Sequence, residues 1–303
     1  NTLRQRKYRV HTILFFIAIV ANCGGLLSPL GDPPLFLLFQ KGAPFTWWLD
    51  NMVPEWLLTG ALLLLVYFLL DLYYYKKEPL ELKMADGHER THLEFSGLIN
   101  VFWLLCVVCS TMFINGKYIP AMAAADAPWY LKLLREWAFL VIICCSWWTT
   151  KKSVREANNY SWGPIMEVAC VFVGIFATMT PALMYLHGMK DTIQAILSEP
   201  WQYVYLTGSL SAFLDNAPTA MVFNSMAPEG AIAGLAADPF LKAISMGAVF
   251  FGALTYIGNG PNFMVKSIAE QEGIKMPSFF GYMIKFSLVV CLPIYVIVQL
   301  ILL

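Results

Sequence analysis

Long apolar runs separated by short polar segments dominate this sequence. Because a transmembrane helix needs about 20 mostly apolar residues, we count the runs that are long enough to cross a bilayer. We predict seven crossings, over residues 10–39, 56–75, 95–114, 129–148, 163–186, 241–269 and 282–303. The first and the sixth are interrupted by Gly and Pro together with Asp or Asn. The pattern therefore predicts an all-α polytopic membrane protein in which two helices are broken.

A further apolar segment, residues 193–226, is broken in its middle by Leu214-Asp215-Asn216-Ala217-Pro218-Thr219. Each arm beside this break has roughly 10 to 20 residues, which is too short for two separate crossings. Backbone groups released from a helix are tolerated at membrane depth only where they face protein or a water-filled cavity. We therefore predict a re-entrant hairpin that enters and leaves the membrane on the same side.

The composition agrees with this interpretation and excludes a soluble globular protein. Hydrophobic residues make up 58% of the 303 residues, charged residues make up 13%, and the mean hydropathy is +0.61. A soluble domain averages roughly 45–50% and about 25% in these two classes. Lys+Arg and Asp+Glu balance at 20 each, which gives no indication of nucleic-acid binding. The cysteines lie in apolar runs without a metal-ligand spacing, so we predict buried thiols and no cofactor.

Basic residues are distributed unevenly between the two predicted sides of the membrane. The side of the first residue carries 13 Lys and Arg, and the opposite side carries 6. Cytoplasmic loops carry an excess of these residues, so we place the first residue in the cytoplasm. The odd number of crossings then places Leu303 outside, and the segment 193–226 enters from outside. The longest polar segment, residues 76–94, is predicted to be a cytoplasmic loop.

The two broken crossings resemble each other. Four positions align at a constant offset of 227, and a polar elbow and a long apolar helix follow each break. The aligned pairs are Gly31 with Gly258, Asp32 with Asn259, Pro34 with Pro261, and Phe36 with Phe263. Because the first and sixth crossings run in opposite directions, the pairs predict an inverted-topology repeat, the architecture of many secondary transporters.

The repeat also predicts how the chain is organised. Residues 1–94 would be the remainder of the first repeat, and residues 95–303 would hold three helices and the second repeat with hairpin 193–226, broken helix 241–269 and helix 282–303. Subtracting the offset from Asp215 gives a position upstream of Asn1. We therefore expect the chain to be an N-terminally truncated fragment whose first hairpin lies just before it.

The three breaks supply the candidate binding residues. Asp215 is the most informative, because a charged side chain at the bilayer centre costs at least about 2.5–3.5 kcal/mol. The alternative is that it caps the half-helix that Pro218 opens, and Asp32 has the same two interpretations. With Asn259, Asp215 is a candidate Na⁺ site. The other candidates for contact with the transported species are Asn216, Thr219, Ser211, Asn262, Gly31, Gly258 and Gly260. Pro33, Pro34, Pro218 and Pro261 are expected to have structural roles at helix starts.

The local chemistry favours a cation as the transported species. Neither broken crossing contains a Lys or Arg within its break, and a bare carboxylate substrate would meet like charges there. We predict cation-coupled transport, with Na⁺/H⁺ antiport as the first hypothesis. The alternative is citrate carried with Na⁺ or H⁺, or as a metal–citrate complex, and a remote alternative is a non-transporting membrane scaffold. An enzyme is not expected, because the residues before Asp32 are Pro29-Leu30-Gly31 and lack the Gly-x-Gly-Asp pattern of intramembrane aspartyl proteases.

Three ordered stretches resemble the ion transporter superfamily: residues 22–34, residues 213–219 and residues 258–263. Within it, the chain is most similar to bacterial citrate transporters and NhaD-type sodium/proton antiporters, over essentially its whole length. The resemblance implies an elevator-type carrier of the bacterial inner membrane. Its expected partners are the lipid bilayer, a small ion or carboxylate, and a second copy in a homodimer. It further implies that Asp215, Asn216 and Thr219 match the second hairpin tip, Asn259 and Asn262 the second broken helix, and Gly31 and Asp32 the first.

Overall fold

The computed structural model describes residues 6–82, 95–124, 126–158, 160–228 and 238–303. It is 74% helical, and its described residues contain no strand, which confirms the all-α class. The chain divides into two compact units: residues 1–90 with 168–303 form the larger, and residues 91–167 form the smaller. The predicted division near residue 94 concerns the internal repeat and stays a prediction. Residues 83–94 of the predicted cytoplasmic loop lie outside the described residues.

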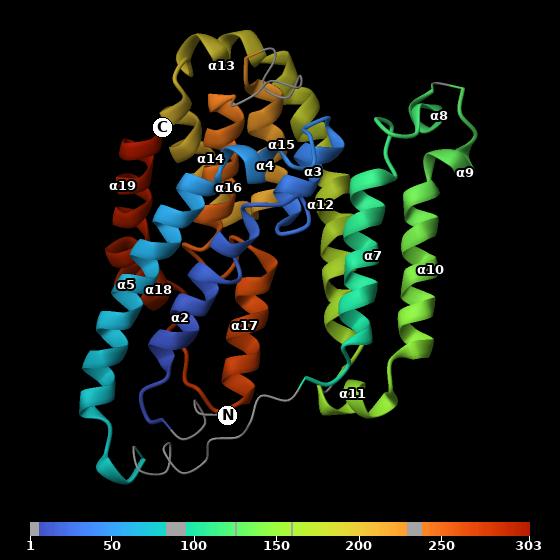
Figure 1. The fold of residues 1–303 in the computed structure, drawn as a ribbon. Coiled ribbons are helices and arrows are strands. Elements are labelled where there is room, and N and C mark those ends of the chain that lie inside the picture. Colours follow the sequence, from blue (N-terminus) through green and yellow to red (C-terminus); the bar gives the residue numbers. More distant parts are fainter. Residues whose placement is uncertain (1–5, 83–94, 125, 159, 229–237) are drawn as a thin grey trace. The chain divides into compact units, whose positions relative to one another are not determined.

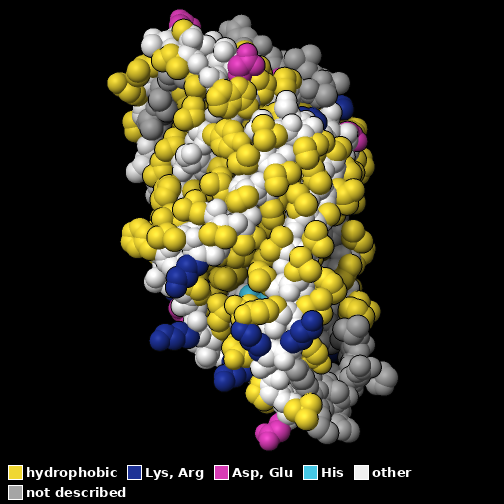
Figure 2. All heavy atoms as spheres, turned by 90° about the vertical axis from the view of Figure 1, so that its left-hand side faces the viewer, with side chains coloured by type: hydrophobic (Ala, Val, Ile, Leu, Met, Phe, Trp, Pro, Cys, Tyr) yellow, Lys and Arg dark blue, Asp and Glu magenta, His cyan; other side chains and the backbone are white. Residues whose placement is uncertain are grey.

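Two helices in the described part are long and apolar enough to cross a membrane. They are α5 (Val53–Lys77) and the continuous helix Phe279–Leu302, which consists of α18 (Phe279–Tyr282), the π-helical stretch η2 (Met283–Cys291) and α19 (Leu292–Leu302). Both lie at predicted crossings. Leu57, Phe68 and Leu300 are more than half exposed on them, and a broad hydrophobic face covers α5 and α19 in Figure 2. Lipid is the solvent that suits such a face.

The first and sixth predicted crossings are interrupted helices in the larger unit. The first consists of α2 (Val10–Ile19), the short 3₁₀ turn η1 (Cys23–Gly25) and α3 (Pro33–Gln40), and the sixth consists of α16 (Pro239–Gly252) and α17 (Gly260–Gln271). In Figure 1, α2 rises to its break from the lower end, whereas α16 descends to its break from the upper end. Each interrupted helix is followed by a long one, α5 or α18–α19. An interrupted helix and a later long helix thus occur twice among the described elements.

The segment predicted as a hairpin contains three helices. α13 (Lys190–Ile196) is followed by α14 (Pro200–Leu214) and α15 (Asn216–Met226), and only Asp215 separates the last two. α14 packs closely on α16, because glycines remove side chains from the contact. A Cβ added to Gly247 would lie 2.6 Å from the Val204 carbonyl oxygen. Small residues at helix crossings are the usual means of close approach within membranes.

The upper end of the larger unit is held by buried polar contacts. The Lys242 ammonium on α16 pairs with Glu55 on α5 at 2.8 Å. The Trp48 indole, on α4 (Trp47–Asn51), donates to Ser245 Oγ at 2.9 Å. Glu55 is 1% exposed, so it needs a partner of opposite charge. These contacts fix α16, and with it the position of its break.

The smaller unit is built on two packed helices, α7 (Ile99–Phe113) and α10 (Leu134–Thr149). The Asn100 carboxamide oxygen accepts hydrogen bonds from Ser146 Oγ at 3.0 Å and Thr150 Oγ1 at 2.6 Å. The predicted crossing 129–148 is not one continuous helix, because the chain is interrupted at Leu133 between α9 and α10. The remaining helices of this part are α8 (Pro120–Ala123), α9 (Trp129–Lys132), α11 (Lys152–Ala157) and the start of α12 (Gly163–Gly188).

Candidate functional site

The two interrupted helices share one backbone conformation at their breaks. Asp32 precedes α3 with φ −152° and ψ 139°, and Asn259 precedes α17 with φ −153° and ψ 135°. Both residues are extended N-caps, and Pro33, Pro34 and Pro261 stand in the first turns behind them. Proline is suited to these positions, because the N–H that it lacks has no partner within the helix. The chain thus starts a new helix in the same way at both places.

Each break closes through a contact between two glycines. A Cβ added to Gly31 would lie 2.2 Å from the carbonyl oxygen of Gly25, and one added to Gly258 would lie 2.6 Å from that of Gly252. These distances leave no room for a side chain, so the chain returns against itself backbone to backbone. Gly25 and Gly252 are separated by the same offset of 227 as Gly31 and Gly258.

The third break lies between α14 and α15 and consists of one strained residue. Asp215 has φ 80° and ψ 141°, a region that is essentially restricted to glycine. The Asp215 side chain is partly exposed, and Thr219 Oγ1 donates to its backbone carbonyl at 2.8 Å. Pro218 lies in the first turn of α15. Strain of this kind is often found at functional sites.

Asp32 is the carboxylate on which all three breaks converge. Asn216 Nδ2, at the first residue of α15, donates to its two oxygens at 2.9 and 3.1 Å. Asn259 Nδ2, at the start of α17, donates to Asp32 Oδ1 at 3.3 Å. Asp32 therefore does not cap α3 through its side chain, and instead joins the N-terminal ends of α3, α15 and α17.

Two further asparagines extend this cluster. Asn22 Nδ2 donates to Asn262 Oδ1 at 2.7 Å, and Asn259 Nδ2 donates to Asn22 Oδ1 at 3.1 Å. Asn262 Nδ2 donates to the carbonyls of Gly252 and Thr255 at 2.7 and 2.9 Å. These carbonyls stand at the end of α16 and in the break, where no helical N–H is available. We call Asp32, Asn22, Asn216, Asn259 and Asn262 the Asp32 cluster.

The electrostatics of the Asp32 cluster are unusual. Asp32 is 3% exposed, and its four asparagine neighbours are 0–1% exposed. In the described part of the chain, no Lys, Arg or His forms an ion pair with Asp32. Within the described structure, the groups that face this carboxylate are amide donors and the positive ends of three helix dipoles. In addition, Asn216 Oδ1 is buried without a hydrogen-bond partner, so an acceptor atom stands next to the carboxylate.

Of the other predicted site residues, Ser211 makes a contact that supports the cluster, and Gly260 has open space beside it. Ser211 Oγ donates to the Ala248 carbonyl at 2.8 Å and thereby links α14 to α16. Gly260 is the first residue of α17, and a Cβ added there would meet no atom within 4 Å. Thr255, which the sequence did not single out, accepts from Gly258 N at 3.0 Å and donates to the Ala212 carbonyl. The structure thus brings the first and sixth crossings and the hairpin segment to one place.

Asn22 is the cluster residue that the sequence analysis did not select as a site residue. It stands before η1, three residues from the end of α2, in a run that is apolar apart from this side chain. A single amide in such a run is a signal, because a polar side chain at membrane depth needs a partner. That partner is distant in sequence, so the run alone does not reveal it.

Replacing Asp215 by Gly should stabilise the fold relative to replacing it by Ala. Both changes remove the carboxylate, but only glycine adopts φ 80° without strain. We expect the Gly variant to unfold with a free energy about 1–2 kcal/mol higher than the Ala variant. Denaturant or thermal unfolding of the purified protein in detergent measures the difference, and equal stability of the two variants would contradict a strained backbone at this break.

The Asp32 cluster contains one carboxylate and no His or Cys, which is too few of the ligand groups typical of a transition-metal site. Among the described residues, no three or more His, Cys, Asp or Glu side chains come together in a way that could hold a metal ion. Carboxylate, amide and backbone oxygens are instead ligands for hard cations. The oxygen atoms of these residues are of the kind that bind a hard cation or a proton.

Comparison with known proteins agrees with a role in transport. The family described as "Putative citrate transport" matches residues 1–303 of the chain. No curated protein and no solved structure matches the chain. The match covers every element of the fold described above, including all three breaks. The chain belongs to this citrate-transport family, and is therefore a membrane protein of a transporter family rather than of an enzyme family.

Proposed function

We propose that this protein is a secondary transporter that carries a cation, Na⁺ or H⁺, at the Asp32 cluster. The observation that carries the proposal is a carboxylate that is 3% exposed and that, among the described residues, is held by neutral amides at the meeting point of three helix starts. A buried charge is costly unless a partner of opposite charge is present. A cation that arrives from solution is such a partner, and it can also leave.

Asparagine side chains suit a site that exchanges its cation. A Lys or Arg beside Asp32 would neutralise the carboxylate permanently, whereas an amide presents a donor or, after rotation, an acceptor. Asn216 donates to Asp32 while its Oδ1 has no partner. Rotation of this amide would turn the oxygen toward a bound ion. Occupation by Na⁺ and by H⁺ would then be alternatives at the same carboxylate, which is the basis of Na⁺/H⁺ antiport.

An alternating-access mechanism for this site follows from an inverted repeat. The proposal is supported by the offset of 227 between the two breaks, by the matching backbone angles of Asp32 and Asn259, and by the opposite directions of α2 and α16 in Figure 1. In transporters built on such repeats, one part moves against the other around a fixed midplane site. We propose an elevator-type carrier with a re-entrant α14–α15 hairpin, a cytoplasmic first residue and an external Leu303, which works in a bacterial inner membrane as a homodimer.

Citrate transport coupled to this cation is the second candidate function. The observation that favours it is the family match over residues 1–303. The Asp32 cluster alone would repel a bare tricarboxylate. With a cation bound to Asp32, the positive ends of α3, α15 and α17 would become available to the substrate carboxylates. In this form citrate would enter only with its cation or as a metal–citrate complex.

Flux measurements in proteoliposomes of the full-length protein test both functions. An imposed pH gradient should drive Na⁺ uptake without citrate if the protein is an antiporter. An inward Na⁺ gradient should drive uptake of labelled citrate if the cation is coupled to the substrate. In either case, acidification on the Na⁺ side should reduce flux, because H⁺ and Na⁺ compete for one carboxylate. If neither Na⁺ nor citrate moves faster than in protein-free vesicles, the proposed function is wrong.

A further inference from the structure

The Asn22 carboxamide joins two asparagines of the Asp32 cluster to the end of its own helix. Its Nδ2 donates to the Ile17 carbonyl of α2 at 2.8 Å and to Asn262 Oδ1 at 2.7 Å. Its Oδ1 accepts from Asn259 Nδ2 at 3.1 Å. Both amide hydrogens and the oxygen of this buried side chain are thus in use. In the described structure Asn22 reaches Asp32 only through Asn259.

Backbone carbonyls fix which atom of each amide faces its neighbours. A carbonyl oxygen can only accept a hydrogen bond, so the Ile17 carbonyl requires the Nδ2 group of Asn22 beside it. The carbonyls of Gly252 and Thr255 require the Nδ2 group of Asn262 in the same way, at 2.7 and 2.9 Å. The two requirements agree, because they bring a donor of Asn22 opposite the acceptor of Asn262. The orientation of the Asn22 amide is therefore set twice.

The orientation of Asn22 determines that of Asn259. Asn22 turns its oxygen toward Asn259, so Asn259 has to present its Nδ2 group. This group also donates to Asp32 Oδ1 at 3.3 Å. If the Asn259 amide turned over, its oxygen would face two acceptors at once, and both would lose a hydrogen bond in a buried place. Asn259 is therefore held as a donor to Asp32.

Asn216, the other asparagine that donates to Asp32, is not held in this way. Its Nδ2 reaches both carboxylate oxygens, at 2.9 and 3.1 Å, but its own Oδ1 is buried without a hydrogen-bond partner. Turning this amide costs its bonds to Asp32, and a cation on the carboxylate would receive the amide oxygen in their place. The two donors to Asp32 thus differ in the movement that their neighbours permit.

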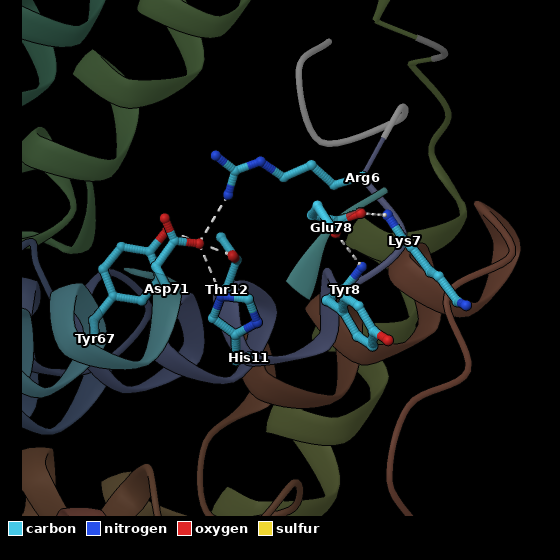
Figure 3. Close-up of polar contacts among 8 residues, drawn as sticks. All are labelled: Arg6, Lys7, Tyr8, His11, Thr12, Tyr67, Asp71 and Glu78. Carbon is cyan, nitrogen blue, oxygen red and sulfur yellow. Dashed lines mark hydrogen bonds and ion pairs between the residues drawn. The ribbon is translucent and has the colours of Figure 1, made fainter. Parts of the chain in front are cut away.

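α2 gives Asn22 a fixed support, because the other end of this helix is tied to α5, as Figure 3 shows. Asp71 on α5 accepts from Arg6 Nη1 at 2.8 Å and contacts His11 Nε2 at 2.9 Å. Glu78, the residue after α5, accepts from two backbone N–H groups of the segment that precedes α2, at 3.2 and 2.8 Å. These contacts do not involve the Asp32 cluster, so a change of the Asn22 side chain leaves them in place.

We propose that Asn22 is a positioning residue that holds Asn259 as a permanent donor to Asp32. Asn216 is then the cluster amide that turns toward the cation. This role of Asn22 rests on the proposed function, in which a cation binds at Asp32. A permanent donor stabilises the free carboxylate and so limits how tightly the cation is held. Asn259 then favours release of the ion and is not one of its ligands.

Na⁺-dependent flux of the Asn22→Leu variant tests this role in proteoliposomes of the full-length protein. Leucine has nearly the size and shape of asparagine but offers Asn259 no acceptor, so the Asn259 amide can turn its oxygen toward the ion. The KM for Na⁺ should fall about tenfold, the change expected for one hydrogen bond to a charged group. The kcat should fall as well, because the ion leaves more slowly. A merely structural loss would lower kcat without lowering KM.

Two further variants support this measurement. Gln299→Leu is the matched control, because Gln299 is a buried amide of α19 that bonds to the Tyr205 hydroxyl at 2.9 Å, outside the Asp32 cluster. It should keep the wild-type KM. If Asn22→Leu fails to fold, Asn22→Ser replaces it. Its hydroxyl can donate to the Ile17 carbonyl but is too short to replace the oxygen that faces Asn259, so KM should again fall.

The outcomes distinguish a failure of this role from a failure of the proposed function. If the wild type shows no Na⁺-dependent flux of Na⁺ or citrate, the proposed function is wrong, and the role of Asn22 is wrong with it. If the wild type is active but the Asn22 variant keeps or raises the KM, the proposed function stands and the positioning role is wrong. An equal fall of KM in Gln299→Leu would also overturn it, because the effect would not depend on Asn259.

Discussion

Replacing Asp32 by Asn should abolish transport while leaving the protein folded. The substitution keeps the shape of the side chain but removes the charge that we propose as the partner of the cation. Two unit charges about 4 Å apart attract each other by about 4 kcal/mol at an effective dielectric constant of about 20. Since about 1.4 kcal/mol corresponds to a factor of ten, cation affinity should fall by about a thousandfold. Na⁺-dependent flux in proteoliposomes should therefore drop to the level of protein-free vesicles at millimolar Na⁺.

The stability of the Asp32→Asn variant separates this effect from misfolding. The Asp32 side chain makes no capping hydrogen bond to α3, and the change removes a buried carboxylate that no ion pair compensates within the described structure. The apparent melting temperature without Na⁺ should therefore be unchanged or higher, whereas the stabilisation that added Na⁺ gives to the wild type should disappear. Asp50→Asn is the matched control, because Asp50 is exposed on α4. Na⁺-dependent flux that survives in Asp32→Asn would place the cation elsewhere.

The comparison of Asp32 with Asp215 shows how much of the site can be predicted from the sequence. Breaks rich in Gly, Pro and Asp identify where a membrane helix stops, because this depends on the local backbone. The sequence therefore indicated all three breaks, and both aspartates as candidates. It ranked Asp215 first, since this residue interrupts the hairpin segment. In the structure Asp215 is partly exposed on a strained backbone, whereas Asp32 is buried among amides from α15 and α17.

The sequence could not predict that Asp32 is buried more deeply than Asp215, because burial depends on contacts between segments that are distant in the chain. Asp32 meets Asn216 across 184 residues and Asn259 across 227. Asn22 meets Asn262 across 240. Local patterns of hydrophobic and polar residues carry no information about such pairs. The internal offset was an exception, since it pointed to Asp32 and Asn259 as equivalent positions before their contact was known.

The predicted crossings agree with the structure where a long apolar run is a continuous helix, and differ from it where the helix is interrupted within such a run. The runs at 56–75 and 282–303 are long helices, because nothing within them releases the backbone. The run 129–148 was predicted as one crossing, yet the helix is interrupted at Leu133, next to the charged residues Lys132, Arg135 and Glu136. No glycine or proline marks that position. Hydropathy measures the apolar character of a segment and does not show where its helical hydrogen bonds end.

The glycine pairs at the two breaks are the part of the site that tolerates least change. Asp32 and Asn259 come into contact because the backbone folds back on itself within each of the two breaks. At Gly31 the nearest atoms to an added Cβ are the backbone O, Cα and C of Gly25, at 2.2, 2.6 and 2.8 Å. A flexible side chain could move away from such a contact, but a packed backbone cannot do so without shifting the residues beside it. The residue beside Gly31 is Asp32.

Replacing Gly31 by Ala should therefore destabilise the protein and misplace Asp32 at the same time. Overpacking in a core typically costs about 1–3 kcal/mol, and we expect at least the upper value here because backbone meets backbone. Thermal unfolding in detergent measures the stability, and flux in proteoliposomes should fall with it. Gly60→Ala on α5 is the matched control, because an added Cβ there also meets nothing within 4 Å and Gly60 lies outside the site. If the two variants were equally stable and equally active, the close return of the chain at Gly25 and Gly31 would not be what positions Asp32.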